Sequence, residues 1–326
     1  MSAVALSVVI PAYQAEAHLR ACLDGLLAQT ADADRFEILV VDDASPDGTA
    51  SVAESYDRVR LVRRDENGGA AAARNLGARE ARGGVLLFLD SDVTPEPDLV
   101  DGVLAVFADP QVRAATGRYG PEPANPTRFA RYKALWTWHC WEHTGARTGR
   151  SGHLQGALAA VRREDLLAAG GFDERYEGGN VEDYELSARL AEQGVEIVFD
   201  DRIGGRHLFP GMSTVARNYW DRTRMWVRLG PARKGFSSGQ ANRRSGLAAL
   251  GALGGAAGLV LPPLLPLAVP CGLVWLGASA PFLGFVVRRE GPAFAAYAAG
   301  THFALSAVVG AAALSAPFGR GSRRGA

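Results

Sequence analysis

Short apolar runs alternate with segments of helical periodicity along the first third of the chain. Each run is rich in Val, Leu and Ile and is bounded by Gly, Pro or acidic residues, which is typical of buried strands. The expected strands are 6–10, 37–41, 58–62 and 84–90, and the expected helices between them are 12–29, 49–56 and 70–82. Strands that alternate with helices in this way are the signature of right-handed βαβ units. We therefore expect an α/β fold with a Rossmann-like, mostly parallel sheet.

The fourth apolar run, residues 84–93, ends in Asp90 and Asp92 with one serine between them. Its Val, Leu and Phe residues predict a central strand that is buried on both faces, which places the two carboxylates at its carboxyl end. Ligands of open α/β sheets bind at that edge, and two carboxylates at this spacing can face one hard divalent cation. Such a cation would suit a diphosphate. The alternative is a solvated acidic loop that caps a following helix, whose start is predicted by Pro95 and Pro97.

Residues 180–194 predict a helix with Asn180 as its N-cap and Asp183 as the capping-box partner. A carboxylate in the first turn of a helix is rigidly presented, so Asp183 could also act as a general base if that turn faces the site. A further strand is expected at 196–199, and His207 follows it, either as a satisfied loop histidine or as a further metal ligand.

The second expected strand runs into Asp42 and Asp43, in a turn rich in acids and helix breakers. Neither of two common nucleotide motifs is present. Asn67-Gly68-Gly69-Ala70 lacks the Gly-Lys-Ser/Thr of a P-loop, and no G-x-G-x-x-G follows the first strand. ATP hydrolysis and a dinucleotide cofactor are therefore not supported.

Residues 127–143 carry three tryptophans, two histidines and a cysteine. The spacing of the histidines and the cysteine matches no common metal site. An amphipathic helix at a membrane interface or a lid over a pocket fits the tryptophans better, and plain core packing is at least as probable.

The last quarter of the chain is almost free of charge. Residues 245–287 form an uncharged stretch of 43 residues, about twice the ~20 that one transmembrane helix needs. Two spans and a possible third at 291–319 follow from this. Arginine pairs at 243–244 and 288–289 flank the first hairpin, so the positive-inside rule places the catalytic part on the cytoplasmic side of the cell (inner) membrane. We expect one globular domain at 1–235 and a membrane segment at 236–326.

Composition excludes some function classes. Lys+Arg and Asp+Glu both number 35, and the seven arginines and one glutamate from Arg243 onward give that part +6. A nucleic-acid binder would instead cluster basic residues on a globular face, so we expect no nucleic-acid partner. The three cysteines are far apart, which suits a reducing compartment or simple burial. The apolar amino terminus has no basic n-region, so we interpret it as the first strand.

The order of short motifs along residues 6–190 resembles that of the family-2 glycosyltransferases. The matching motifs are Val9-Ile10-Pro11-Ala12-Tyr13, Val40-Val41-Asp42-Asp43-Ala44-Ser45, Ala73-Arg74-Asn75-Leu76-Gly77, Phe88-Leu89-Asp90-Ser91-Asp92, Val161-Arg162-Arg163, Gly170-Gly171-Phe172-Asp173-Glu174 and Glu182-Asp183. Each motif is weak alone, and together they are highly specific. The resemblance implies a GT-A fold and transfer of a sugar from a nucleoside diphosphate donor (UDP or GDP).

The same resemblance assigns roles to individual residues. It implies that Pro11, Tyr13, Asp42 or Asp43, and Arg74 line the nucleotide pocket. It also implies that Asp90 and Asp92 hold Mg²⁺ or Mn²⁺ against the diphosphate. Asp183 would be the general base of one in-line displacement that inverts the anomeric centre, with Glu182 beside it in an acceptor or positioning role.

Departures from the family pattern refine the expectation. Gln14 stands where many relatives have Asn, and Leu158 stands where many have the Asn of Gly-Ala-Asn, which puts the usual acceptor contacts in doubt. Processive synthases carry Gln-x-x-Arg-Trp, whereas here Arg224 and Trp226 lie at a different spacing without the glutamine, so Trp226 is only a weak acceptor candidate. We therefore expect a single transfer. The membrane segments and the tryptophan cluster suggest an acceptor that is lipid-linked or a cell-envelope glycan.

Two other functions remain as alternatives. A sugar nucleotidyltransferase has a related sheet, but it needs a glycine-rich loop and a catalytic lysine after the first strand, which this chain lacks. A catalytically silent membrane scaffold is disfavoured by the intact Asp90, Asp92 and Asp183.

Overall fold

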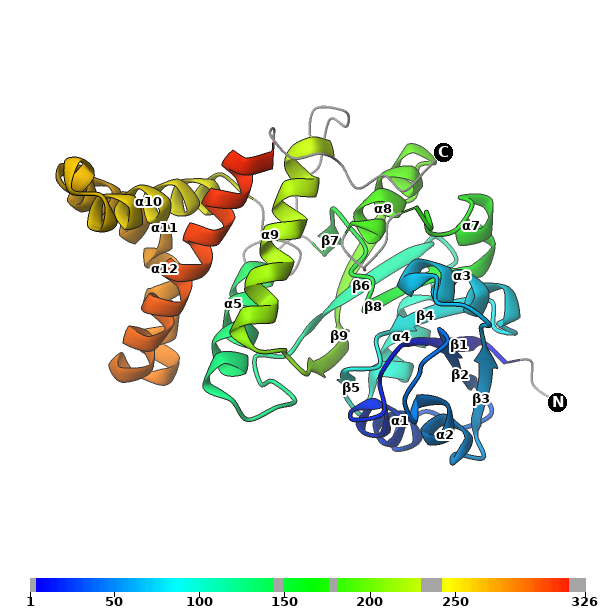
Figure 1. Ribbon diagram of the computed structural model, residues 1–326. Helices are drawn as coiled ribbons and strands as arrows, with labels where there is room; N and C mark the ends of the chain where they lie inside the picture. The colour runs from blue at the N-terminus through cyan, green and yellow to red at the C-terminus, as the bar shows by residue number, and fades with distance from the viewer. Residues whose placement is uncertain (1–3, 143–148, 176–180, 230–241, 317–326) are drawn as a thin grey trace. The chain divides into compact units, whose positions relative to one another are not determined.

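The computed structural model describes residues 4–142, 149–175, 181–229 and 242–316. Its contacts divide the chain into two compact units, Met1–Phe209 and Pro210–Ala326. The first unit is built on one mixed sheet with the strand order β3-β2-β1-β4-β8-β6-β9-β5, in which β7 pairs with β9 (Figure 1). The predicted α/β fold with a mostly parallel, GT-A-like sheet is confirmed.

The parallel part of the sheet follows the predicted alternation closely. Its strands are β1 (Leu6–Ala12), β2 (Phe36–Asp42), β3 (Val59–Arg63) and β4 (Val85–Leu89), and the helices between them are α1 (Leu19–Leu27), α2 (Thr49–Glu54) and α3 (Gly69–Glu80). β1 pairs in parallel with both β2 and β4. Because parallel neighbours end at one edge, the segments that follow β1, β2 and β4 meet there.

Hydrophobic clusters cover the two faces of this sheet. Val8 and Ile10 of β1 pack with α1, α2 and α4, while Val9 packs with α3, α7 and α8 on the other face. Every residue of β4 is buried, as expected for a central strand. Gly77 allows α3 to lie against the sheet, because a Cβ there would come within 2.2 Å of Val9 Cγ1.

The rest of the first unit adds both antiparallel and parallel strand pairs to this half-sheet. The remaining elements of the first unit are β5 (Val93–Pro95), α4 (Leu99–Val106), β6 (Ala114–Tyr119), α5 (Arg128–Glu142), β7 (Arg150–Ser151), β8 (Leu158–Arg162), α7 (Arg163–Ala168), α8 (Glu182–Glu192) and β9 (Ile197–His207). β8 pairs antiparallel with β4, so residues just before β8 lie beside the carboxyl end of β4.

Three expectations need refinement here. The N-cap position of α8 is held by Val181, with no side-chain capping bond, and Asn180 lies outside the described residues. His207 is the last residue of a long strand and not a loop residue, because β9 extends well past the predicted 196–199. Trp141 on α5 is buried, which favours core packing for that helix.

The second unit consists of helices: α9 (Met212–Leu229), α10 (Arg243–Val260), the 3₁₀ turn η2 (Pro262–Leu264), α11 (Leu265–Glu290) and α12 (Pro292–Ser315). Two segments among the described residues, 262–290 and 292–315, are long and apolar enough to cross a membrane, and α10 is not one of them. Only 22% of the first segment's apolar window and 33% of the second's are buried, which is low for core helices of a soluble protein. Small residues of α10 pack against α11: a Cβ at Gly251 or Gly258 would come within 2.7 Å of the α11 backbone. Close packing through glycine with large apolar residues outside is typical of membrane helices, and it suggests membrane association.

Candidate active site

The ends of β1 and β2 form one side of the candidate site. Pro11 is buried in β1 opposite Val41 of β2, whereas Tyr13, just beyond the strand, is 48% exposed. The side chain of Tyr13 is therefore available to a ligand. Gln14 follows with a φ of 51°, a left-handed conformation that a non-glycine residue rarely adopts.

The two aspartates after β2 are both buried but have different surroundings. Asp43 accepts hydrogen bonds from the backbone N–H groups of Gly68 (3.0 Å) and Gly69 (2.7 Å) at the start of α3, and it pairs with Arg64. This carboxylate therefore caps α3, as expected for an anion at a helix N-terminus. Asp42 accepts one backbone bond, from Ser45, through Oδ1. Its buried Oδ2 has no hydrogen-bond partner among the described residues and lies 3.8 Å from Nε of the exposed Arg63. Asp42 is thus the better placed of the two to bind a ligand.

Arg74 connects two parts of the site that are far apart in sequence. Its guanidinium is buried on α3 and donates to Asp90 Oδ1 (2.9 Å) at the end of β4 and to Glu182 Oε1 (2.8 Å) in the first turn of α8. The two carboxylates raise the pKa of Arg74, against the opposing effect of burial, so it stays charged. The residue predicted to line the nucleotide pocket is therefore also the link between the Asp-x-Asp loop and α8.

Asp92 is the more isolated of the two aspartates after β4. Its Oδ2 lies 3.4 Å from His207 Nε2, and its Oδ1 is buried without a hydrogen-bond partner in the described part of the chain. Burial, reinforced by the charge of Asp90, raises the pKa of Asp92 from 3.8 to about 7, and His18 opposes the shift. The ring of His207 packs between Tyr119 and Phe209, with both ring centroids 4.6 Å away.

The residues present fit a divalent cation that takes few protein ligands. Within the described residues there is no group of three or more His, Cys, Asp or Glu side chains arranged to hold a metal by themselves. Mg²⁺ in phosphate sites is held by one or two carboxylates, with substrate oxygens and water as the other ligands. Asp90 and Asp92 meet that requirement, and the unsatisfied Asp92 Oδ1 is an oxygen that a cation could bind.

Asp183 reaches the same region from α8. Its Oδ2 accepts from the backbone N–H of Gly156 at 3.4 Å, and its Oδ1 accepts from Tyr184 N at 2.8 Å. The next carbonyl, that of Ala157, accepts from Asp90 N at 3.3 Å. The segment 156–157 therefore lies between the acids after β4 and the predicted base, so the structure brings these groups together.

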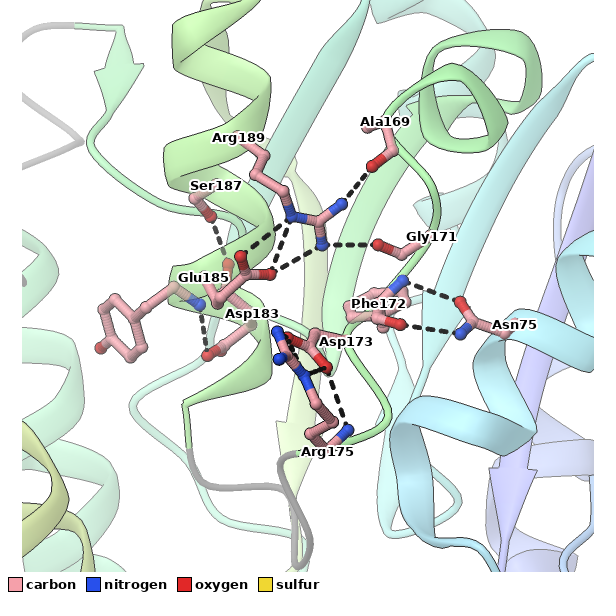
Figure 2. A network of polar contacts seen from close by, with 11 residues as sticks. Asn75, Ala169, Gly171, Phe172, Asp173, Arg175, Asp183, Glu185, Ser187 and Arg189 are labelled. Atoms are coloured by element: carbon pink, nitrogen blue, oxygen red, sulfur yellow. Dashed lines mark hydrogen bonds and ion pairs between the residues drawn. The ribbon is translucent and has the colours of Figure 1, made fainter. Parts of the chain in front are cut away.

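A network on the far side of α8 fixes the position of that helix (Figure 2). Asn75 of α3 forms two hydrogen bonds of 2.8 Å with the backbone of Phe172, and Arg189 of α8 donates to Gly171 O (2.6 Å) while pairing with Glu185. The Gly170-Gly171-Phe172 loop is thus held between α3 and α8. The motifs around Asn75, Phe172 and Glu182 therefore form one connected structure.

Buried polar atoms without a hydrogen-bond partner in the described residues gather at this site. They include Asp42 Oδ2, Arg74 Nε, Asp92 Oδ1, Gln155 Oε1 and Glu182 Oε2. Such atoms are rare in folded proteins and need an explanation. A polar ligand that binds among them would provide one.

Sequence reasoning missed His18, Tyr119 and Gln155, which lie beside the candidate metal and base residues. None of the three belongs to a charged pair or a recognisable spacing, so only the fold identifies them. Trp226 lies on α9 in the second unit, and its predicted acceptor role stays a prediction.

Comparisons with known proteins identify relatives of this chain. Residues 7–167 match the family described as glycosyl transferase family 2. The chain is 27% identical to "Glycosyltransferase AglE" of Haloferax volcanii over 62% of this chain and 66% of that protein. It is 33% identical to "Validoxylamine A glucosyltransferase" of Streptomyces hygroscopicus subsp. limoneus over 58% of this chain and 48% of that protein. The chain thus spans about half to two thirds of the length of these relatives.

Solved structures show the same fold. The mannosyltransferase PcManGT of Pyrobaculum calidifontis, solved with GDP-Man and Mn²⁺, superposes with a TM-score of 0.58 at 21% identity, covering 96% of this chain and 87% of that one. S. aureus TarS 1–349 superposes with a TM-score of 0.52 at 16% identity, covering 98% of this chain and 93% of that one.

Proposed function

We propose that this chain, which belongs to glycosyltransferase family 2, transfers a sugar from a nucleoside diphosphate sugar to an acceptor hydroxyl with inversion at the anomeric carbon. The observation that carries the proposal is the bridge from Asp90 through Arg74 to Glu182. It joins the acids suited to a diphosphate with the helix turn that carries a candidate base. The solved relatives support the donor class, since PcManGT holds GDP-Man and TarS has been solved with UDP-GlcNAc.

In this proposal the nucleoside binds across the ends of β1 and β2. Tyr13 supplies an exposed ring beside the strand ends, and Asp42 supplies a buried carboxylate oxygen that can accept from the base. Pro11 shapes the floor of the pocket. Asp43 contributes indirectly, because its carboxylate holds the start of α3 and thereby the helix that carries Arg74.

The proposed chemical step uses Asp183 as general base. Its carboxylate takes the proton of the acceptor hydroxyl, the hydroxyl oxygen bonds to the anomeric carbon, and the bond from that carbon to the diphosphate oxygen breaks. The nucleoside diphosphate leaves with the electron pair. Attack and departure on opposite faces of the sugar invert the anomeric centre.

Asp90 and Asp92 would hold Mg²⁺ or Mn²⁺ at the diphosphate, with His207 beside Asp92. Such an ion, when bound, offsets the negative charge that develops on the leaving group. Arg74 orients Asp90 through its hydrogen bond. Glu182 positions Arg74 from the opposite side.

We further propose that the enzyme is anchored in the cell membrane with its catalytic unit on the cytoplasmic side. If 262–290 and 292–315 are the two spans, the chain returns to the side on which it entered. That topology leaves Arg243 and Arg244 on the catalytic side and, unlike the hairpin expected from the sequence, places the pair at 288–289 on the other side. A membrane location favours a lipid-linked or cell-envelope acceptor and a single transfer.

A donor screen tests the function directly. Purified full-length protein in detergent is incubated with Mn²⁺ and a panel of UDP- and GDP-sugars, and release of UDP or GDP is measured. We expect Asp92→Asn to abolish the activity and Asp183→Asn to abolish transfer while donor binding persists. Asp98→Asn, a matched change at an exposed position before α4, should leave activity unchanged. Full transfer by Asp183→Asn would refute the assignment of the base.

A further inference from the structure

Gln155 is a residue of the site that none of the sequence motifs contains. It lies in the segment between β7 and β8, with its backbone fixed on both sides. Its N–H donates to Thr116 Oγ1 at 3.0 Å, and its carbonyl accepts from Leu158 N at 2.8 Å. The side chain therefore projects from a rigid position and not from a free loop.

The side-chain amide of Gln155 has an open carbonyl end. It lies close to Tyr119, a buried residue of β6, and acts to lower the pKa of that residue against the larger opposing effect of burial. The Oε1 of Gln155 is buried and has no hydrogen-bond partner among the described residues. A buried carbonyl oxygen without a donor is unfavourable, and the fold tolerates it most readily where a ligand supplies the donor.

The surroundings place this oxygen on the donor side of the site. A Cβ at the neighbouring Gly156 would lie 3.4 Å from the guanidinium carbon of Arg74. The carbonyl of Ala157 accepts a hydrogen bond from Asp90 N. Burial raises the pKa of Tyr119, and the charges of the nearby Asp90 and Asp92 raise it further. Gln155 thus lies beside the segment that contacts Arg74 and Asp90, close to where the sugar attached to the proposed diphosphate would lie.

The chemistry of the open end selects its partner. An amide oxygen only accepts hydrogen bonds, so it cannot bind an ionised phosphate oxygen, which is also an acceptor. Sugar hydroxyls are donors. We propose that Gln155 Oε1 accepts a hydrogen bond from one hydroxyl of the transferred sugar and so helps to select the donor. This inference rests on the proposed function, because it needs a nucleotide sugar in the site.

The test compares donors that differ by one hydroxyl. The nucleotide sugar that gives the largest thermal shift in the panel serves as the parent, and its monodeoxy analogues are titrated against full-length protein by calorimetry. We expect the wild type to bind one analogue about five- to a hundredfold more weakly than the parent, because the buried oxygen is then left unpaired. Gln155→Met, similar in length and without the amide, should bind that analogue and the parent equally.

Controls separate the possible failures. Gln193→Met changes an exposed glutamine at the end of α8 and should keep the wild-type discrimination. The free nucleoside diphosphate should bind Gln155→Met as it binds the wild type. If Gln155→Met does not bind the free nucleoside diphosphate, Gln155→Asn replaces it in the test. This variant keeps the amide but shortens the side chain, and its affinities for the parent donor and the monodeoxy analogue are compared in the same way.

Two results would overturn the inference while leaving the proposed function intact: a Gln155 variant that discriminates as the wild type does, or a wild type that tolerates every single deoxygenation. Absence of nucleotide binding by the wild type would instead overturn the proposed function, and this inference with it.

Discussion

Gly171 and Gly194 offer a matched test of how the Gly-Gly-Phe loop holds the site together. Both adopt a φ of +73°, a backbone conformation that alanine disfavours by about 1–2 kcal/mol. They differ in their surroundings. A Cβ at Gly171 would come within 2.5 Å of Asn75 Oδ1, whereas a Cβ at Gly194 has nothing within 4 Å.

The magnitude follows from these contacts. Gly194→Ala should lower the free energy of unfolding by the backbone cost alone, about 1–2 kcal/mol. Gly171→Ala adds the displacement of Asn75, which makes two 2.8 Å hydrogen bonds with Phe172. At about 1 kcal/mol for each bond, the total loss should be about 3–4 kcal/mol. Because Asn75 follows Arg74 on α3, the same change should also weaken nucleotide binding.

The assay is a urea titration of the full chain in detergent, followed by tryptophan fluorescence, since α5 of the first unit carries three of the six tryptophans. Gly171→Ala should unfold at a clearly lower urea concentration than Gly194→Ala, and only Gly171→Ala should bind UDP or GDP more weakly. Equal midpoints for the two variants would refute the reasoning, because they share the backbone cost and differ only in the contact with Asn75.

Four further predictions concern charge and backbone. Arg74→Met should lower the free energy of unfolding by about 3–5 kcal/mol, because Asp90 and Glu182 lose their buried partner. Glu182→Gln should then lower it less in the Arg74→Met background than in the wild type, which a double-mutant cycle measured by urea unfolding would show. Because the pKa of Asp92 is raised to about 7, protons should compete with Mn²⁺ for this carboxylate below pH 7. The Mn²⁺ affinity, measured by calorimetry with saturating nucleotide sugar, should fall about tenfold per pH unit below 7 and level off above it. An affinity that stays constant from pH 5.5 to 8 would contradict this. Stability should change with pH in the opposite direction. Because the folded pKa of Asp92 is raised above 3.8, the metal-free protein should lose stability as the pH rises from 3.8 to about 7. Thermal melts at several pH values should show this loss, and the melting temperature of Asp92→Asn should depend less on pH. Gln14→Asn should raise stability by about 0.5–1 kcal/mol, because asparagine tolerates a φ of 51° better, whereas a loss would show that the side chain of Gln14 itself is needed.

The parallel half of the sheet could be predicted from sequence because its signals are local. Strands such as β4 are short apolar runs with clear breakers at both ends, and each predicted strand boundary fell close to the observed one. The first helix is a correction, because it begins at Leu19 and not at residue 12. Local signals fail where tertiary pairing extends an element. β9 runs to His207 because its second half pairs with β5 and β6, and the polar sequence Asp200-Asp201-Arg202 within it gives no sign of a strand.

The candidate site was predictable in its residue types and not in its connections. The positions of Asp90, Asp92 and Asp183 follow from motif order and from the carboxyl-edge rule. Nothing near Arg74 in sequence indicates that it pairs with Glu182, because the two are 108 residues apart. In the same way, the capping of α3 by Asp43 depends on a turn that the sequence does not reveal.

These long-range bonds give a physical reason why several weak motifs occur together in one chain. Arg74 and Asn75 are neighbours on α3, and they bond to Glu182 and Phe172 respectively. A change in any one of these positions leaves a buried polar group unpaired in another, at a cost of about 1–3 kcal/mol or more when a charge is involved. The motifs therefore act as a single unit that holds the end of β4 and the first turn of α8 at a fixed separation. In the proposed mechanism, a sugar passes from a diphosphate bound at the first to an acceptor bound at the second only while that separation is kept.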